Sequence, residues 1–132
     1  MTVEAPVVQA VVLADHVYQD RETGKYVVAG TFNQLRGHEF PCELTTPVHL
    51  FCVLTSVSAP TAVSMRFVSS EEQIVMSSSA VTITCRDPQQ TIEFALPVPS
   101  LRLPAPGWYR LVLFIDDTPR GFVRLEVLQI HE

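Results

Sequence analysis

Apolar and polar residues alternate with a period of two along most of the chain, and turn residues interrupt the alternation roughly every eight to twelve positions. Because successive side chains of a strand point to opposite faces, this pattern predicts half-buried β-strands. Many short strands between turns are typical of an all-β sandwich or barrel. We therefore expect an all-β protein with about eight strands and no long helix.

The predicted strands are bounded by turn residues and are, in chain order, Val7 to Tyr18, Tyr26 to Leu35, Val48 to Val57, Val63 to Phe67, Val81 to Cys85, Ile92 to Leu96, Gly107 to Ile115 and Phe122 to Ile130. The first two strands form a hairpin about a turn at Asp20 to Lys25, and the last two about a turn at Asp116 to Gly121. Placing these hairpins on opposite edges predicts a two-sheet antiparallel sandwich of the immunoglobulin-like or jelly-roll kind.

Three segments depart from the alternation. Arg36 to Pro47 predicts a loop, because its apolar residues have no period. Ser69 to Ala80 fits either a single helical turn with a serine cap or a short edge strand. Pro97 to Pro106 contains prolines at positions 97, 99, 104 and 106, and it predicts an extended crossover between the two sheets.

Two predicted strands are apolar on both faces, Val48 to Val57 and Gly107 to Ile115. A sandwich buries only one face of each strand, so the second face must meet a loop, another chain or water. The proline-rich crossover is one candidate cover, and a homo-oligomer contact is the other.

Length and composition narrow the class of protein. The 132 residues form about one domain, predicted to span 1–132. A hydrophobic fraction of 47% excludes disorder. No apolar segment approaches the roughly 20 residues of a membrane span, and the N-terminus lacks the pattern of a secretory signal. We therefore expect a cytoplasmic protein without a membrane partner.

Charge argues against a nucleic-acid partner. The net charge is −5, and Lys25 is the only lysine, beside eight arginines scattered along the sequence. Phosphate binding needs a concentrated basic face, which this spacing does not predict.

The three cysteines are Cys42, Cys52 and Cys85, which are odd in number and lack C-x-x-C spacing. We predict reduced thiols in the core. A Cys42–Cys52 bridge is the only local pairing to consider.

Candidate catalytic and metal-binding groups are sparse. Asp15 and His16 are adjacent on a strand, so they point to opposite faces and do not address one substrate. The chain has no G-x-S-x-G elbow and no glycine-rich phosphate loop. We therefore predict neither an enzyme nor a cofactor site.

Two sets of residues are candidate metal ligands. His38, Cys42 and His49 match no established zinc spacing. Asp116 and Asp117 are able to hold calcium, but a tight turn favours the same residues on its own. We predict no metal site.

Two resemblances support the fold. The segment Gly107 to Leu111 resembles the penultimate strand of immunoglobulin-like sandwiches, which implies that the hydroxyl of Tyr109 bonds nearby backbone at a corner. The stretches Leu13 to Phe32 and Phe114 to Gly121 resemble an uncharacterised family of small bacterial proteins of unknown function. That resemblance implies a β-sandwich in a bacterial cytoplasm and brings no activity.

We therefore predict a non-enzymatic β-sandwich module of unknown role that works by protein contact, with itself or with another protein. The expected contact residues are Trp108, Arg110, Val112 and Phe114, because aromatic and arginine side chains carry a large share of interface energy. The alternative is a sandwich that binds a carbohydrate or another small ligand, with an aromatic platform near the loops of His38, Asp87 or Asp116.

Overall fold

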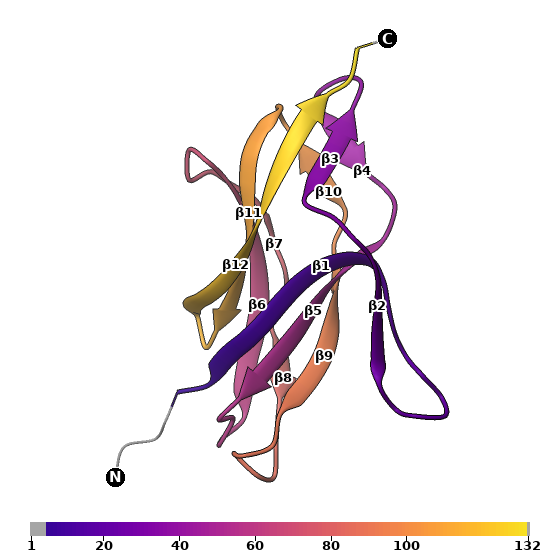
Figure 1. Cartoon of the computed structure of the whole chain (residues 1–132). Coiled ribbons are helices and arrows are strands. Elements are labelled where there is room, and N and C mark those ends of the chain that lie inside the picture. Colours follow the sequence, from indigo (N-terminus) through magenta and orange to yellow (C-terminus); the bar gives the residue numbers. More distant parts are fainter. Residues whose placement is uncertain (1–4, 132) are drawn as a thin grey trace.

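A computed structural model describes residues 5–131, and these residues form β-strands and connecting turns without a helix (Figure 1). The twelve strands are β1 (Val7–Gln19), β2 (Tyr26–Thr31), β3 (Gln34–Gly37), β4 (Cys42–Leu44), β5 (Val48–Thr55), β6 (Thr61–Ser69), β7 (Ile74–Ser77), β8 (Val81–Ile83), β9 (Ile92–Val98), β10 (Leu101–Leu103), β11 (Gly107–Ile115) and β12 (Thr118–Gln129). Accordingly, no described segment has the helical length and hydropathy of a membrane span.

The strands form two main layers. One sheet has the order β2-β1-β5-β9, and the other has the order β3-β12-β11-β6-β7, with β8 also pairing with β6 (Figure 1). A short ribbon of β4 and β10 lies beside them. The prediction of an all-β, two-sheet sandwich is confirmed, with one parallel pairing, β3 with β12, among antiparallel ones.

Side chains from both sheets fill the space between them. Leu50, Cys52 and Leu54 project from β5, and Phe67 and Leu113 project from the six-stranded sheet; none of the five is exposed. Alternation of the strands sends these residues inward, because the inner faces of a sandwich interdigitate. The core therefore depends on the period of two that the sequence displays.

The predicted strand Tyr26 to Leu35 is wrong as a single element. Its first part is β2, beside β1, whereas its second part is β3, which pairs in parallel with β12 in the other sheet. Gly30 adopts a left-handed φ of +75°, and a Cβ at Gly30 would lie 2.7 Å from Oδ2 of Asp15. Only glycine fits this close approach, and β2 ends one residue later.

The difference between eight predicted strands and twelve observed ones comes from short elements. β3, β4, β7 and β10 have only three or four residues each, too few to show an alternation. The predicted loop Arg36 to Pro47 accordingly contains β4, which pairs with β10.

The segment Ser69 to Ala80, for which the sequence allowed either a helical turn or an edge strand, contains the edge strand β7. Ser69 begins a tight turn in which its hydroxyl oxygen accepts hydrogen bonds from the backbone N–H groups of Glu71 (3.3 Å) and Gln73 (3.1 Å). β7 then returns antiparallel to β6. The serine therefore caps a turn rather than a helix.

The predicted crossover at Pro97 to Pro106 is confirmed. It leads from β9 in the four-stranded sheet to β11 in the six-stranded sheet, through β10. Leu101 and Leu103 of β10 are each 2% exposed, so these apolar residues of the crossover are buried.

The closing hairpin is tighter than predicted and is not at an edge. Asp116 and Asp117 form the whole turn, with φ values of 48° and 65°. Positive φ at both central positions is the geometry of a type I′ turn, whose twist suits a two-residue hairpin. β12 is flanked by β3 and β11 by β6, so the hairpin lies inside its sheet.

Tyr109 occupies the corner that the immunoglobulin-like resemblance implies. It is 3% exposed, and its hydroxyl donates a 2.6 Å hydrogen bond to the carbonyl oxygen of Ala105. Its ring stacks on Phe67, with centroids 5.2 Å apart. This bond fixes the chain where the crossover enters β11.

Candidate functional site

The outer side of the six-stranded sheet carries all four residues that the sequence analysis selected. Odd-numbered residues of β11 from Tyr109 to Ile115 belong to the core, so even-numbered residues point outward. Trp108 is 51% exposed, whereas Val112 and Phe114 are 8% and 9% exposed. The second face of this strand therefore combines an accessible end at Trp108 with a covered end at Phe114.

Neighbouring strands complete this surface. Arg110 lies between Val68 of β6 and Arg124 of β12, and Val112 lies between Arg66 and Phe122. We call the surface the arginine-aromatic face; its members are Arg66, Val68, Trp108, Arg110, Val112, Phe114, Phe122 and Arg124.

An arginine of the same chain covers the apolar end of this face. Val68, Val112 and Phe114 form a small cluster of their own outside the main core. The guanidinium carbon of Arg66 lies 4.3 Å from the ring centroid of Phe114. A cation over an aromatic ring is attracted to it and also shields it from water. Val112 and Phe114, two of the four predicted contact residues, are therefore largely inaccessible.

Phe122, and not the predicted contact residue Phe114, is the exposed phenylalanine of this face. It is 47% exposed, and the guanidinium carbons of Arg110 and Arg124 lie 5.7 and 5.8 Å from its ring centroid. Its alternation with Val123 was visible in the sequence, but only the pairing with Val112 places it on this face.

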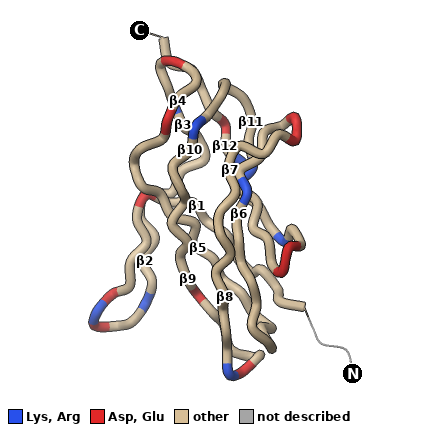
Figure 2. Tube along the Cα trace, turned by 180° about the vertical axis from the view of Figure 1, so that it is seen from behind, with Lys and Arg blue, Asp and Glu red and all other residues tan. Residues whose placement is uncertain are grey.

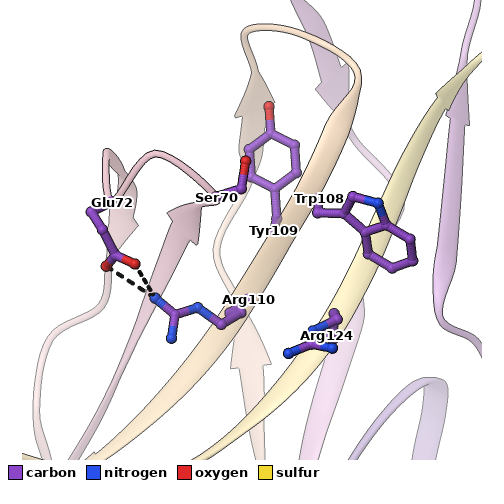
Figure 3. Close-up of a pocket in the computed structure, with 6 residues that line it drawn as sticks. All are labelled: Ser70, Glu72, Trp108, Tyr109, Arg110 and Arg124. Carbon is purple, nitrogen blue, oxygen red and sulfur yellow. Dashed lines mark hydrogen bonds and ion pairs between the residues drawn. The ribbon is translucent and has the colours of Figure 1, made fainter.

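Arg110 has one carboxylate partner. Its Nη2 atom donates to both carboxylate oxygens of Glu72, at 2.8 and 3.0 Å (Figure 3). Glu72 stands in the turn between β6 and β7 with a left-handed φ of 64°. The backbone N–H of Ser70 in the same turn donates to the carbonyl oxygen of Trp108, at 2.9 Å. The turn is thereby attached to β11.

A pocket of about 430 Å³ opens between this turn and the two arginines, and its lining residues are Ser70, Glu72, Trp108, Tyr109, Arg110 and Arg124 (Figure 3). The indole of Trp108 and the guanidinium of Arg124 border it from neighbouring strands. Cationic groups beside an aromatic surface suit an anionic group attached to an apolar one. None of its lining residues is His38, Asp87 or Asp116, near which an aromatic platform for a small ligand was expected. Asp87 and Asp116 border other pockets, of about 620 and 210 Å³, which no aromatic side chain lines.

Acidic residues and the arginines of the arginine-aromatic face differ in where they lie. Most acidic residues lie in turns, whereas Arg66, Arg110 and Arg124 lie within strands of one sheet (Figure 2). Strand pairing thus brings these three of the eight arginines, which are far apart in the sequence, onto one surface.

The other candidate residues, which were considered as metal ligands or catalytic groups, are not brought together in a site. Across residues 5–131 there is no group of three or more histidine, cysteine, aspartate or glutamate side chains able to hold a metal ion. Asp116 connects the hairpin turn to β6, since its Oδ1 atom accepts a 2.9 Å hydrogen bond from the backbone N–H of Ala62. Asp15 and His16 are both exposed, on β1.

The three thiols are free, but only one is a core residue. Cys52 is fully buried, and burial raises the pKa of its thiol to about 12 from an ordinary 9.0. Cys42 and Cys85 are half-buried, so the prediction of three core thiols is wrong for these two. Cys85 lies at the margin of the core, where its thiol approaches the carbonyl oxygen of Asp87 at 3.2 Å.

Comparison with known proteins places this structure in a family. Residues 9–128 match the DUF6941 family, described as a family of unknown function. No protein with curated functional information matches the sequence significantly.

Solved structures share the fold at low identity. An immunoglobulin-like protein from Pseudomonas aeruginosa is 11% identical, with a TM-score of 0.50, over 96% of this chain and 99% of that one. An alkylpurine DNA glycosylase from Pseudomonas fluorescens, bound to DNA with an abasic site analog, is 11% identical with a TM-score of 0.51. The match covers 91% of this chain and 30% of the glycosylase chain. Both likenesses concern the fold alone.

Proposed function

The chain belongs to the DUF6941 family, and we propose that it is a non-enzymatic module that binds another protein through the arginine-aromatic face. One observation carries this proposal: Trp108 and Phe122, each about half exposed, lie beside three arginines on one side of a sheet. Tryptophan and arginine are the residues most enriched among those that dominate binding energy.

The packing of this face supports a role in contact rather than in stability alone. Inner residues of β11 already bury the strand against the core, so Trp108 adds little to folding where it stands. Ile74 on β7, 55% exposed and paired with Val68, extends the apolar surface toward the sheet edge. Exposed apolar side chains gathered on one surface are characteristic of interaction sites.

Charge distinguishes a different partner from a second copy. In a two-fold symmetric contact the same patch meets itself, so Arg66, Arg110 and Arg124 would share one interface with the same three arginines of the other copy. Like charges brought together in an interface cost several kcal/mol, on the order of the binding energy of a weak complex. We therefore favour a partner of different sequence over self-assembly through this face.

The test is site-specific photo-crosslinking in an extract of the source cells. A benzoylphenylalanine at position 122 is expected to give a discrete protein adduct, and the Arg124→Ala substitution is expected to remove it. The matched control places the same group at Tyr18, which is 55% exposed on β1 and outside the face. Identical adducts at both positions, or none at position 122, would contradict the proposal, and a mass twice that of the chain would indicate self-assembly instead.

The pocket favours a second candidate, binding of a small ligand. A volume of about 430 Å³ is within the range of small-molecule sites, and Trp108 offers a half-exposed indole beside it. Native mass spectrometry of the protein purified from its source cells distinguishes the two. A bound mass of a few hundred daltons that disappears with Trp108→Ala would favour the small ligand.

A further inference from the structure

Positive charge is concentrated on the arginine-aromatic face, although the whole chain carries a net charge of −5. Arg66, Arg110 and Arg124 lie on the neighbouring strands β6, β11 and β12. Within residues 5–131, the only ion pair of these arginines is that of Arg110 with Glu72. Two of the three guanidinium groups therefore have no carboxylate partner in the described part of the chain.

Arg110 and Arg124 are directly opposite each other on paired strands. Like charges in this position destabilise a sheet. The ring of Phe122 lies within 6 Å of both guanidinium carbons, but its π-face attracts cations without neutralising them. An anionic group placed between the two arginines would relieve this repulsion, which gives the pocket a preference for a negatively charged ligand.

Glu72 shows the kind of group that the pocket accepts. Its carboxylate bonds Arg110 through both oxygens, while its side chain remains 73% exposed. Ion pairs at such exposed positions contribute little stability, because water solvates both partners almost as well. A carboxylate from outside is therefore able to replace Glu72 at small cost, and it gains the contact with Arg124 that Glu72 lacks.

Building on the protein-binding function above, we propose that the partner presents an acidic peptide segment. A carboxylate of the segment binds between Arg110 and Arg124 in exchange for Glu72, and an adjacent apolar side chain packs on Trp108 and Phe122. Complementary charge supports this occupant, since a basic patch with an exposed aromatic centre matches an acidic segment with an apolar anchor.

Nucleic acid fits this surface less well. A duplex carries one charge per roughly 1.7 Å of its axis, and its binding needs a broad set of cations. Here Glu126 lies directly opposite Trp108, and Glu71 and Glu72 stand in the adjoining turn. These carboxylates limit the positive surface to a patch that suits a short acidic segment.

The experiment is selection from a displayed library of random 12-residue peptides. The wild-type chain is the bait, and the Arg110→Ala/Arg124→Ala variant removes peptides that bind elsewhere. The strongest peptide is then synthesised in two forms, one with its acidic residues and one with each replaced by its amide. Binding is followed by the fluorescence of Trp108, the only tryptophan of the chain, which borders the pocket.

We expect the selected peptides to be enriched in aspartate and glutamate beside an apolar residue. The acidic form should bind at least tenfold more tightly than its amide form. Arg124→Gln should weaken binding at least tenfold, and Glu72→Gln should strengthen it about threefold. The control Arg86→Ala, an exposed arginine outside the face, should leave binding unchanged. Circular dichroism and a thermal melt verify that each variant is folded.

The outcomes separate this proposal from the protein-binding function. Selected peptides without acidic residues, or equal affinity of the acidic and amide forms, would overturn the acidic partner and leave protein binding intact. Failure to select any peptide at this face would overturn the acidic partner, and with no crosslink at position 122 it would overturn both. Tighter binding of a 12-base-pair DNA duplex than of the acidic peptide would replace both with a nucleic-acid role.

Discussion

The two sides of strand β11 differ in what covers their apolar residues. On the inner side, Leu111, Leu113 and Ile115 are at most 2% exposed and pack against the opposite sheet. On the outer side, Phe114 clusters with Val68 and Val112 under the guanidinium of Arg66, and Trp108 is left half exposed. A sandwich has only one interior, so the apolar residues of the second face need cover from elsewhere.

This difference separates stability from recognition within one strand. A complete layer of the opposite sheet cannot move away without unfolding, because it carries its own share of the core. A flexible arginine, by contrast, changes position without any change in the fold. The outer side is therefore suited to binding, and the inner side to holding the strand in place.

The largest expected effect comes from truncating the inner side. Leu113→Ala should lower the free energy of unfolding by about 3 kcal/mol, because it leaves a cavity at a fully buried position. Val112→Ala, the adjacent outer residue, should cost at most about 1.5 kcal/mol. Urea denaturation followed by circular dichroism measures both. Equal losses would contradict the distinction between the two sides.

A dry interior also predicts how stability depends on pH. The pKa of Cys52 is about 12 in the folded state, above its ordinary 9.0, so the unfolded chain releases this proton first as pH rises. The contribution is fully present below pH 9 and is lost as pH rises toward 12, with a loss of about 1.4 kcal/mol by pH 10. Unfolding free energies at pH 8 and pH 10 measure it.

The control for this pH dependence is Cys52→Ala. Between pH 8 and pH 10 the free energy of unfolding of this variant should fall by about 1.4 kcal/mol less than that of the wild-type chain. Cys42 and Cys85 are half-buried and should react with a thiol reagent in the native state, whereas Cys52 should react only after unfolding. Fast native labelling of Cys52 would contradict a dry inner layer.

At the corner of the same strand, Tyr109→Phe should cost about 1 kcal/mol. The substitution removes the hydrogen bond to the carbonyl oxygen of Ala105 and keeps the ring that stacks on Phe67. Thermal and urea unfolding measure the loss. An unchanged stability would show that the corner is held by packing alone.

The smallest change in stability is expected on the outer side. Arg66→Ala should cost about 0.5–1 kcal/mol through loss of the cation–π contact with Phe114. Its clearer effect should be exposure of Phe114, read as increased binding of an apolar dye such as anilinonaphthalene sulfonate. Arg120→Ala, an exposed arginine in β12, is the control and should leave dye binding unchanged. No increase for Arg66→Ala would show that Phe114 is covered by something other than this arginine.

The fold followed from local pattern where strands were long. Nine residues of β6 and twelve of β12 display enough alternation to identify a strand and its two faces. Strands of three or four residues were missed or left open because they are too short to display an alternation. The division of Tyr26 to Leu35 between two sheets was also hidden, because alternation says nothing about which neighbour a strand pairs with.

The candidate site followed from the sequence only in part. Trp108 and Arg110 were predicted on one face, since both are even-numbered positions of a single strand. Phe122, Arg124 and Glu72 join them from other parts of the chain, through pairing of β11 with β12 and through the turn before β7. No spacing in the sequence indicates these contacts.

The sequence by itself determined the all-β class and the faces of the strands that alternate, because side-chain alternation acts over a few residues. The Tyr109 corner was implied by the immunoglobulin-like resemblance of Gly107 to Leu111. The tertiary structure decided which arginines share a surface and which aromatic rings stay exposed. Strand order and register bring residues such as Glu72 and Arg110 together across 38 positions. Arg66, Arg110 and Arg124, which are far apart in the sequence, thereby share one surface of an acidic chain.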